Sequence, residues 1–169
     1  MSGAGHQHFL YFMRKLIDET NTEHLREALF GPWRYRDPAP SLRWDPEDDR
    51  RYALRWREPS TDPLRTVRGA NRLAFEALSL LPVIPTHTRA VTTGFTGQRS
   101  SNIFWTWPIW SRSLPLDVTR SLLSLSTLVT ENEANSHAEL TARGIVAVFR
   151  SQRISIGKYR NFTPAQSVL

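Results

Sequence analysis

Residues 145–149 read Ile-Val-Ala-Val-Phe, a continuous apolar run. A short run of this kind is typical of a strand that is buried on both faces. Other segments rich in β-branched and aromatic residues read as strands too. They lie at residues 153–158, which we expect to pair with the first run, and at 91–95 and 103–107, joined by the polar loop 97–102.

Helical patterns surround these strands, with apolar residues three and four apart and recognisable starts and stops. The five expected helices cover residues 8–18, the segment from the capping box 20–23 to Gly31, residues 66–81 before Pro82, a segment capped by Asp117, and residues 136–143 before Gly144. The third helix should bury Leu73, Ala74, Ala77, Leu78 and Leu81. The fourth should bury Leu122, Leu125, Leu128 and Val129.

A segment rich in proline and tryptophan separates the second and third helices. Six prolines between residues 32 and 64 exclude long helices there, apart from one short piece near 48–56. Trp33, Trp44 and Trp56 need burial, so we expect an ordered loop. The predicted fold class is helix-dominated α+β with a small antiparallel β element, in a single compact domain over residues 1–169. Its parts are a helical start (1–31), the loop region (32–64) and helices with short strands (65–169).

Arginine dominates the charge of the chain. The 22 Lys and Arg outnumber the 16 Asp and Glu, which gives a net charge of +6, and only Lys15 and Lys158 are lysines. The guanidinium group pairs bidentately with phosphate and stacks on bases, so the excess favours a nucleic-acid partner. A GC-rich genome explains the ratio of arginine to lysine equally well, but it does not explain the net charge.

The composition also indicates the cellular compartment in which the protein is expected. The chain has no cysteine, which removes disulfides and thiolate metal sites and fits a reducing environment. No apolar run reaches 18 residues, and the N-terminus has no basic region followed by an apolar one. We therefore expect a cytoplasmic protein with no membrane partner.

No group of residues predicts catalysis, and we expect no enzyme activity, no bound metal and no cofactor. His6 and His8 have no further metal ligand nearby in the sequence. One acidic cluster resembles the carboxylates of metal-dependent nucleases, but arginines flank it on both sides, which favours internal ion pairs. Its members are Asp45, Glu47, Asp48 and Asp49.

Arg65, Arg68 and Arg72 are spaced to share one face at the start of the third helix. Cations at a helix N-terminus face the positive end of the helix dipole, so an anion is expected beside them. Phosphate is one candidate for that anion. The nearby carboxylates of Asp62 and Glu58 are an equally favoured alternative.

The C-terminal segment is basic throughout. Residues 141–169 hold five basic residues and no acid, which indicates an anionic partner. Three of the five, in residues 150–158, are expected along one hairpin surface that follows phosphates. The candidate nucleic-acid contacts outside the third helix are Arg51 and Arg55 from the segment 50–57, Arg99 from the polar loop, and Arg143, Arg150, Arg153, Lys158 and Arg160.

Five segments carry a resemblance to a known family. They are residues 2–7 (SGAGHQ), 41–46 (SLRWDP), 49–54 (DRRYAL), 69–74 (GANRLA) and 157–164 (GKYRNFTP). Together they resemble the C-terminal part of large subunits from type I CRISPR surveillance complexes of the G (formerly U) or a related subtype. In that family this part can be translated separately as the small subunit. The resemblance extends over nearly the whole chain.

The resemblance implies a non-catalytic subunit in the prokaryotic cytoplasm. Its basic side chains would contact crRNA and target DNA, including the displaced strand, while cleavage belongs to a recruited helicase-nuclease. The small subunits are helical bundles, so the expected strands depart from the family. Other subunits of the complex are expected to meet the region of Trp105, Trp107 and Trp110. The alternatives are an adaptor whose arginines bind acidic protein, and a nuclease built on Asp45, Glu47 and Asp49.

Overall fold

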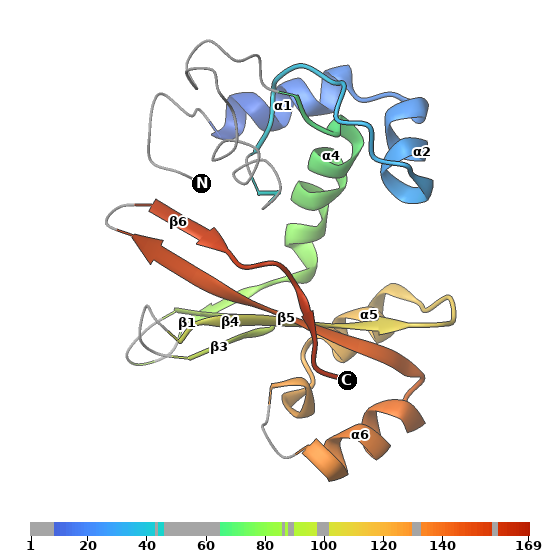
Figure 1. Ribbon diagram of the computed structural model, residues 1–169, viewed down its shortest axis with the longest axis vertical. Helices are drawn as coiled ribbons and strands as arrows, with labels where there is room; N and C mark the ends of the chain where they lie inside the picture. The colour runs from blue at the N-terminus through green and yellow to red at the C-terminus, as the bar shows by residue number, and fades with distance from the viewer. Residues whose placement is uncertain are drawn as a thin grey trace. The chain divides into compact units, whose positions relative to one another are not determined.

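The computed structural model describes residues 9–42, 44–45, 65–85, 87, 90–97, 102–129, 133–156 and 159–169 (Figure 1). The chain groups into two compact units. The first spans Met1–Leu78 and Ile156–Asn161, and the second spans Ser79–Ser155 and Phe162–Leu169. Helices combine with small antiparallel sheets, so the expected α+β class is confirmed. The three-part division of a single domain stays a prediction.

The described residues of the first unit form three helices: α1 (Phe9–Glu19), α2 (Thr22–Phe30) and α4 (Arg68–Glu76). Helix α2 begins with a capping box, placed one residue later than the sequence pattern indicated. Asn21 accepts a hydrogen bond from the backbone N–H of His24, and His24 Nδ1 accepts one from the backbone N–H of Asn21. The helix ends at Gly31, as expected.

The core of the first unit lies where α1 and α4 meet the loop after α2. Leu16, Leu42 and Phe75 are buried there. Helices α2 and α4 touch through their backbones, because a Cβ atom at Gly69 would lie only 2.0 Å from the carbonyl oxygen of His24. Only glycine allows so close an approach.

Several expectations for this unit need correction. Trp33 is 46% exposed and not buried, whereas Trp44 packs against the core; Trp56 lies outside the described residues. The third helix begins at Arg68 and tightens into the 3-10 segment η1 (Ala77–Leu80). Three residues per turn replace 3.6 in that segment, which rotates Leu78 to an exposed position.

Antiparallel strands organise the second unit. Strand β1 (Val83–Pro85) pairs with β2 (Ala90–Thr92). A five-stranded sheet has the order β3 (Phe95–Thr96), β4 (Phe104–Trp110), β5 (Ile145–Ile156) and β6 (Tyr159–Phe162), and β7 (Gln166–Ser167) also pairs with β5. Of these strands, residue 156 of β5 and residues 159–161 of β6 group with the first unit. The longest ladder joins β4 to β5, from Phe104 opposite Gln152 to Trp110 opposite Ile145.

The strands differ from the sequence prediction in three ways. The expected strand 91–95 breaks at Gly94, which has a φ of 77°, so its first half pairs with β1 and its second half with β4. Strand β4 continues through Pro108, where the described ladder pairs β4 with β5 alone, so the missing N–H breaks no described ladder bond. The expected partner strand from residue 153 is instead a continuation of β5 itself.

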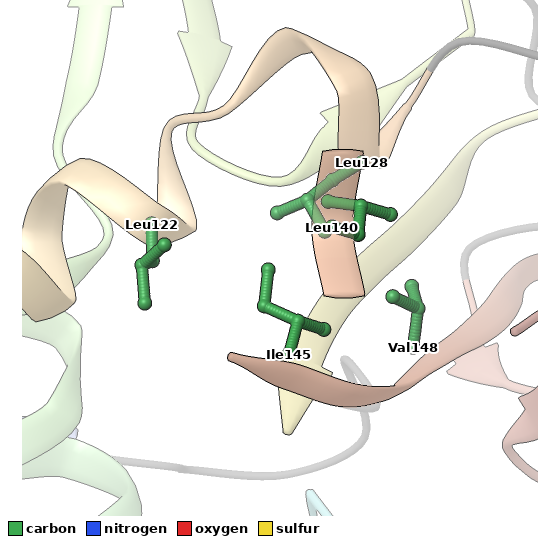
Figure 2. Close-up of a cluster of buried hydrophobic side chains, with 5 residues drawn as sticks. All are labelled: Leu122, Leu128, Leu140, Ile145 and Val148. Atoms are coloured by element: carbon green, nitrogen blue, oxygen red, sulfur yellow. The ribbon is translucent and has the colours of Figure 1, made fainter. Parts of the chain in front are cut away.

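Helices α5 (Leu116–Leu123), η2 (Ser126–Leu128) and α6 (Glu133–Ala142) supply the core of the second unit. Figure 2 shows their buried leucines together with two side chains of β5: Leu122, Leu128, Leu140, Ile145 and Val148. The four residues expected on the inner side of the fourth helix all pack in this core, but only Leu122 lies in α5, because the helix ends at Leu123 and Leu125, Leu128 and Val129 belong to η2 and its flanks. Two details differ, because Pro115 and not Asp117 occupies the N-cap, and Val146 is 58% exposed within the run that was expected to be buried.

Within the described ranges, none of the helices has the length and apolar character that spanning a membrane requires.

Candidate nucleic-acid interface

Arg68 lies in a network of internal contacts. Its side chain is only 11% exposed, and Nη2 lies 3.3 Å from Oε2 of Glu19. Its guanidinium also reaches the carbonyl oxygens of Glu19 and Pro38. Its backbone N–H donates to Oδ2 of Asp37 at 2.8 Å, which places a carboxylate at the start of α4. The anions that this helix start needs are therefore carboxylates of the same unit. Asp62 and Glu58, the expected partners, lie outside the described residues.

Arg65 does not share a helix face with Arg68 and Arg72, which lie four residues apart in α4 and so on one side of it. Arg65 precedes the helix and donates from Nη1 to the carbonyl oxygen of Arg36 at 2.9 Å. Arg72 pairs with Glu76 at 2.7 Å and lies over the ring of Phe75. Arg65 was expected in the same stripe because the helix was placed from residue 66, whereas it begins at Arg68.

Arg143 also has an internal partner. Its Nη2 lies 2.8 Å from Oε1 of Glu139, one helical turn earlier. The expectation that no internal acid neutralises the C-terminal segment is therefore wrong for this residue, because the partner lies just before the segment begins. The pair is about half exposed, so it contributes little to stability.

Arg150 and Arg153 carry the charge of β5, but they do not share a surface. Arg150 lies opposite Thr106, and its Nε donates to Thr106 Oγ1 at 3.2 Å while the guanidinium lies over the ring of Phe104. Arg153 is three residues further along, and an odd separation in a strand places side chains on opposite faces. Its backbone N–H bonds to Ile103, which continues the same register. The single hairpin surface that we expected is thus divided between two faces.

Neither arginine of β5 has an acidic partner in the described part of the chain. The described ion pairs involve Lys15, His24, Arg26, Arg68, Arg72, Arg120 and Arg143. The Nε atom of Arg153 is buried and finds no hydrogen-bond acceptor among the described residues. The positive charges of Arg150 and Arg153 are therefore not neutralised by a described carboxylate.

One face of the five-stranded sheet is aromatic. Register places Phe95 opposite Trp105, and Trp107 opposite Phe149, on this face. The rings contact one another in sequence: 6.1 Å between the centroids of Phe95 and Trp105, 4.5 Å between Trp105 and Trp107, and 6.1 Å between Trp107 and Phe149. Phe162 contacts both Phe95 and Trp105. We call Phe95, Trp105, Trp107, Phe149 and Phe162 the aromatic face. Sequence reasoning did not identify it.

Trp110, which was grouped with Trp105 and Trp107, has a different environment. It packs against the buried core of the second unit, on the side of α5 and η2. Alternation along β4 places Trp110 on the same face as the buried Thr106 and Pro108, opposite Trp105 and Trp107. The three tryptophans therefore do not form one surface.

The strands are free of acidic residues. No Asp or Glu occurs in residues 77–116 or 140–169, which hold eight basic residues, and every described strand falls within these two ranges. The acids of the second unit lie between Asp117 and Glu139, in and around the helices. The sheet is thus a positively charged surface whose described residues include no carboxylate.

The other candidate residues are only partly described. Arg51, Arg55, Arg99 and Lys158 lie outside the described residues, and the main chain of Arg160 lies in β6. Of the acidic cluster, Asp45 accepts a hydrogen bond from the Tyr35 hydroxyl at 2.7 Å, while Glu47, Asp48 and Asp49 lie outside the described residues. Within the part of the chain that is described, no group of three His, Asp or Glu is arranged to hold a metal ion.

Comparisons with known proteins return no match, whether to family models, to curated proteins or to solved structures.

Proposed function

We propose that this chain is a non-catalytic protein that binds nucleic-acid backbone without reading its sequence. The observation that supports the proposal best is the sheet that lacks acidic residues. Arg153 lies on one face of these strands and Arg150 on the other, and no described carboxylate neutralises either of them. A polyanion that approaches the strands meets no repelling charge from them.

Phosphate is the anion that fits these side chains best. A guanidinium donates two parallel hydrogen bonds to phosphate, and binding releases counterions from the nucleic acid. Because these contacts go to the backbone, they supply affinity and leave sequence discrimination to other components. Arg65, Arg68, Arg72 and Arg143 contribute less in this proposal, because each already has an internal partner.

The setting that we propose is a CRISPR ribonucleoprotein, and it rests on the sequence resemblance alone. In such a complex the chain would contact crRNA and target DNA, or the displaced strand, and guide pairing would supply the sequence specificity. Other subunits would hold it in place. The test of this setting is co-purification with crRNA and neighbouring subunits when the surrounding genes are expressed together, and purification free of both would contradict it.

The binding function has a separate test that distinguishes it from an adaptor for acidic proteins. Fluorescence anisotropy would measure binding of the full chain to a labelled oligonucleotide, with polyglutamate of matched charge as competitor. The proposal predicts that unlabelled oligonucleotide displaces the probe at concentrations at least about tenfold lower than polyglutamate, since arginine pairs bidentately with phosphate and the phosphate charges are closely spaced. Displacement by polyglutamate at equal or lower concentration would favour the adaptor.

A further inference from the structure

We infer that the aromatic face of the five-stranded sheet stacks the unpaired bases of single-stranded DNA, with Arg153 beside it as a phosphate contact. This inference rests on the proposed nucleic-acid function and specifies the surface and the form of the ligand.

The first observation is that the five rings form one connected layer. Each ring has a neighbour within 6.4 Å, and the layer extends from β3 across β4 to β5 and to Phe162 at the end of β6. Successive bases of a single strand stack on platforms of this kind, and every base has a flat π face, so stacking needs no particular sequence.

The second observation concerns exposure. None of the five rings is buried; each keeps part of its surface in contact with solvent. The opposite face of the same strands is the one that packs inward, since Val148, Pro108 and Thr106 are buried there and Val148 belongs to the core with α5, η2 and α6. The second unit therefore builds its core without the aromatic face.

The third observation is that the backbone holds Trp105 in place. Gly94, with a φ of 77°, accepts a hydrogen bond from the backbone N–H of Thr106, and a Cβ atom there would lie 3.1 Å from Nε1 of Trp105. Together with the stacked ring of Phe95, this fixes the indole before any ligand arrives. A ring that is already ordered loses little entropy when a base stacks on it.

Charge selects the class of ligand. The aromatic face lies in strands without acidic residues, and alternation along β5 places Arg153 on the same side as Phe149 and Trp105. An apolar ligand or an apolar protein surface carries no anion that could pair with this arginine, whereas a single strand of nucleic acid presents bases and phosphates together. Duplex DNA is disfavoured because its bases are already stacked inside the helix.

The polar groups on the aromatic face favour DNA over RNA. Proteins distinguish RNA through contacts to its 2′-hydroxyl. The described strand residues place three hydroxyl groups on this side. Ser151 is 5% exposed, the Oγ of Ser155 is buried, and the Oγ of Ser167, which lies opposite Phe149, already donates to the carbonyl oxygen of Leu169 at 2.6 Å. None of the three offers an unused donor to a ribose, so we assign the occupant as single-stranded DNA.

The experiment uses the full chain and three probes of about 20 nucleotides, a length that exceeds the typical site of one binding domain: oligo(dT), a DNA duplex and oligo(rU). The test variant is W105L/W107L, which keeps apolar side chains but removes two platforms. The control is F104L, which removes a ring from the opposite face of the same strand. A second variant, W105F/W107F, keeps the rings and should bind oligo(dT) within about threefold of wild type, since stacking needs only a flat π face.

We expect wild type to bind oligo(dT) at least about tenfold more tightly than the duplex, and W105L/W107L to lose about tenfold or more of that affinity, because stacking two bases contributes this much. F104L should stay within about twofold of wild type, and the affinity of both variants for duplex should be unchanged. Wild-type tryptophan fluorescence should fall when oligo(dT) binds, which needs no variant to fold.

Three results would overturn the inference. Unchanged oligo(dT) affinity in W105L/W107L, with salt-dependent binding intact, would show that the aromatic face does not stack bases, and the proposed nucleic-acid function would still hold. If wild type bound none of the three probes, both the stacking inference and the proposed nucleic-acid function would be wrong. Binding of oligo(rU) as tight as that of oligo(dT), with the same loss in W105L/W107L, would overturn the assignment to DNA.

Discussion

Arg150 and Arg153 lie on opposite faces of strand β5, although only two residues separate them. Arg150 donates a hydrogen bond from Nε to Thr106, and its guanidinium group lies over the ring of Phe104. Arg153 lies on the side of the aromatic face, where no described acceptor satisfies its Nε. Although the two residues carry the same charge, we expect Arg153 to contact phosphate more readily than Arg150.

Substitution of these two residues one at a time should separate their roles. Glutamine removes the charge and keeps a donor, so R150Q retains a bond to Thr106. We expect R153Q to weaken binding to single-stranded DNA about fivefold to tenfold, because it removes one phosphate contact, and R150Q to weaken it less than about threefold. Anisotropy titrations at a single salt concentration measure both. Equal effects of the two substitutions would mean that the side of the strand does not matter.

Arg68 should matter for stability and not for binding. R68A removes a mostly buried guanidinium and leaves Glu19 with only its 3.6 Å pair to Lys15, which should lower the free energy of unfolding by about 2 kcal/mol. R65A is the matched control, because its exposed side chain loses one bond to a carbonyl, worth about 0.5 kcal/mol. Urea unfolding monitored by circular dichroism measures both. A strong loss of DNA affinity in folded R68A would instead make it a phosphate contact.

Gly69 should tolerate no side chain. Alanine is a better helix former than glycine by about 1 kcal/mol, yet its Cβ would collide with the His24 carbonyl, so we expect a net loss of about 3 kcal/mol in G69A. G144A has open space around the new Cβ but a φ of 79°, and it should cost only about 1 kcal/mol. Thermal unfolding compares the two. A stabilised G69A would show that helices α2 and α4 do not touch at this point.

The core in Figure 2 should respond to truncation according to burial. Leu140 is 4% exposed, so L140A should lower the free energy of unfolding by about 2–5 kcal/mol. Leu116, 53% exposed at the start of α5, should change it by less than about 0.5 kcal/mol when truncated in the same way. Similar values for the two variants would contradict the assignment of the core to the inner leucines.

The sequence predicted the helices better than the strands. Caps, glycine stops and 3.6-residue spacing are local signals, and they located α1, α2 and α6 within a few residues. The path of β5 could not be read in this way, because Arg150 and Arg153 interrupt the apolar run at the point where the strand continues. Their place in a strand depends on pairing with β4, about 45 residues earlier in the chain.

The candidate site was predictable in charge but not in shape. The sequence shows directly that no acidic residue follows residue 140. Residues 77–116 also lack acidic residues, and this further signal would have indicated that β4 belongs to the same basic surface. The aromatic face was not visible, because Phe95, Trp105 and Phe149 come together only through cross-strand register. The internal partners of Arg68, Glu19 and Asp37, lie about 50 and 30 residues earlier in the chain and were hidden for the same reason.

The salt dependence of binding to single-stranded DNA is the most direct test of nucleic-acid binding by this chain. Affinities of the full chain for oligo(dT) would be measured from about 50 to 300 mM salt and plotted as logarithms, since each phosphate contact contributes a slope of about −0.7. Three or more contacts therefore predict a slope of about −2 or steeper. A slope near zero, or no binding at the lowest salt, would contradict the proposal that the acid-free sheet binds nucleic-acid backbone.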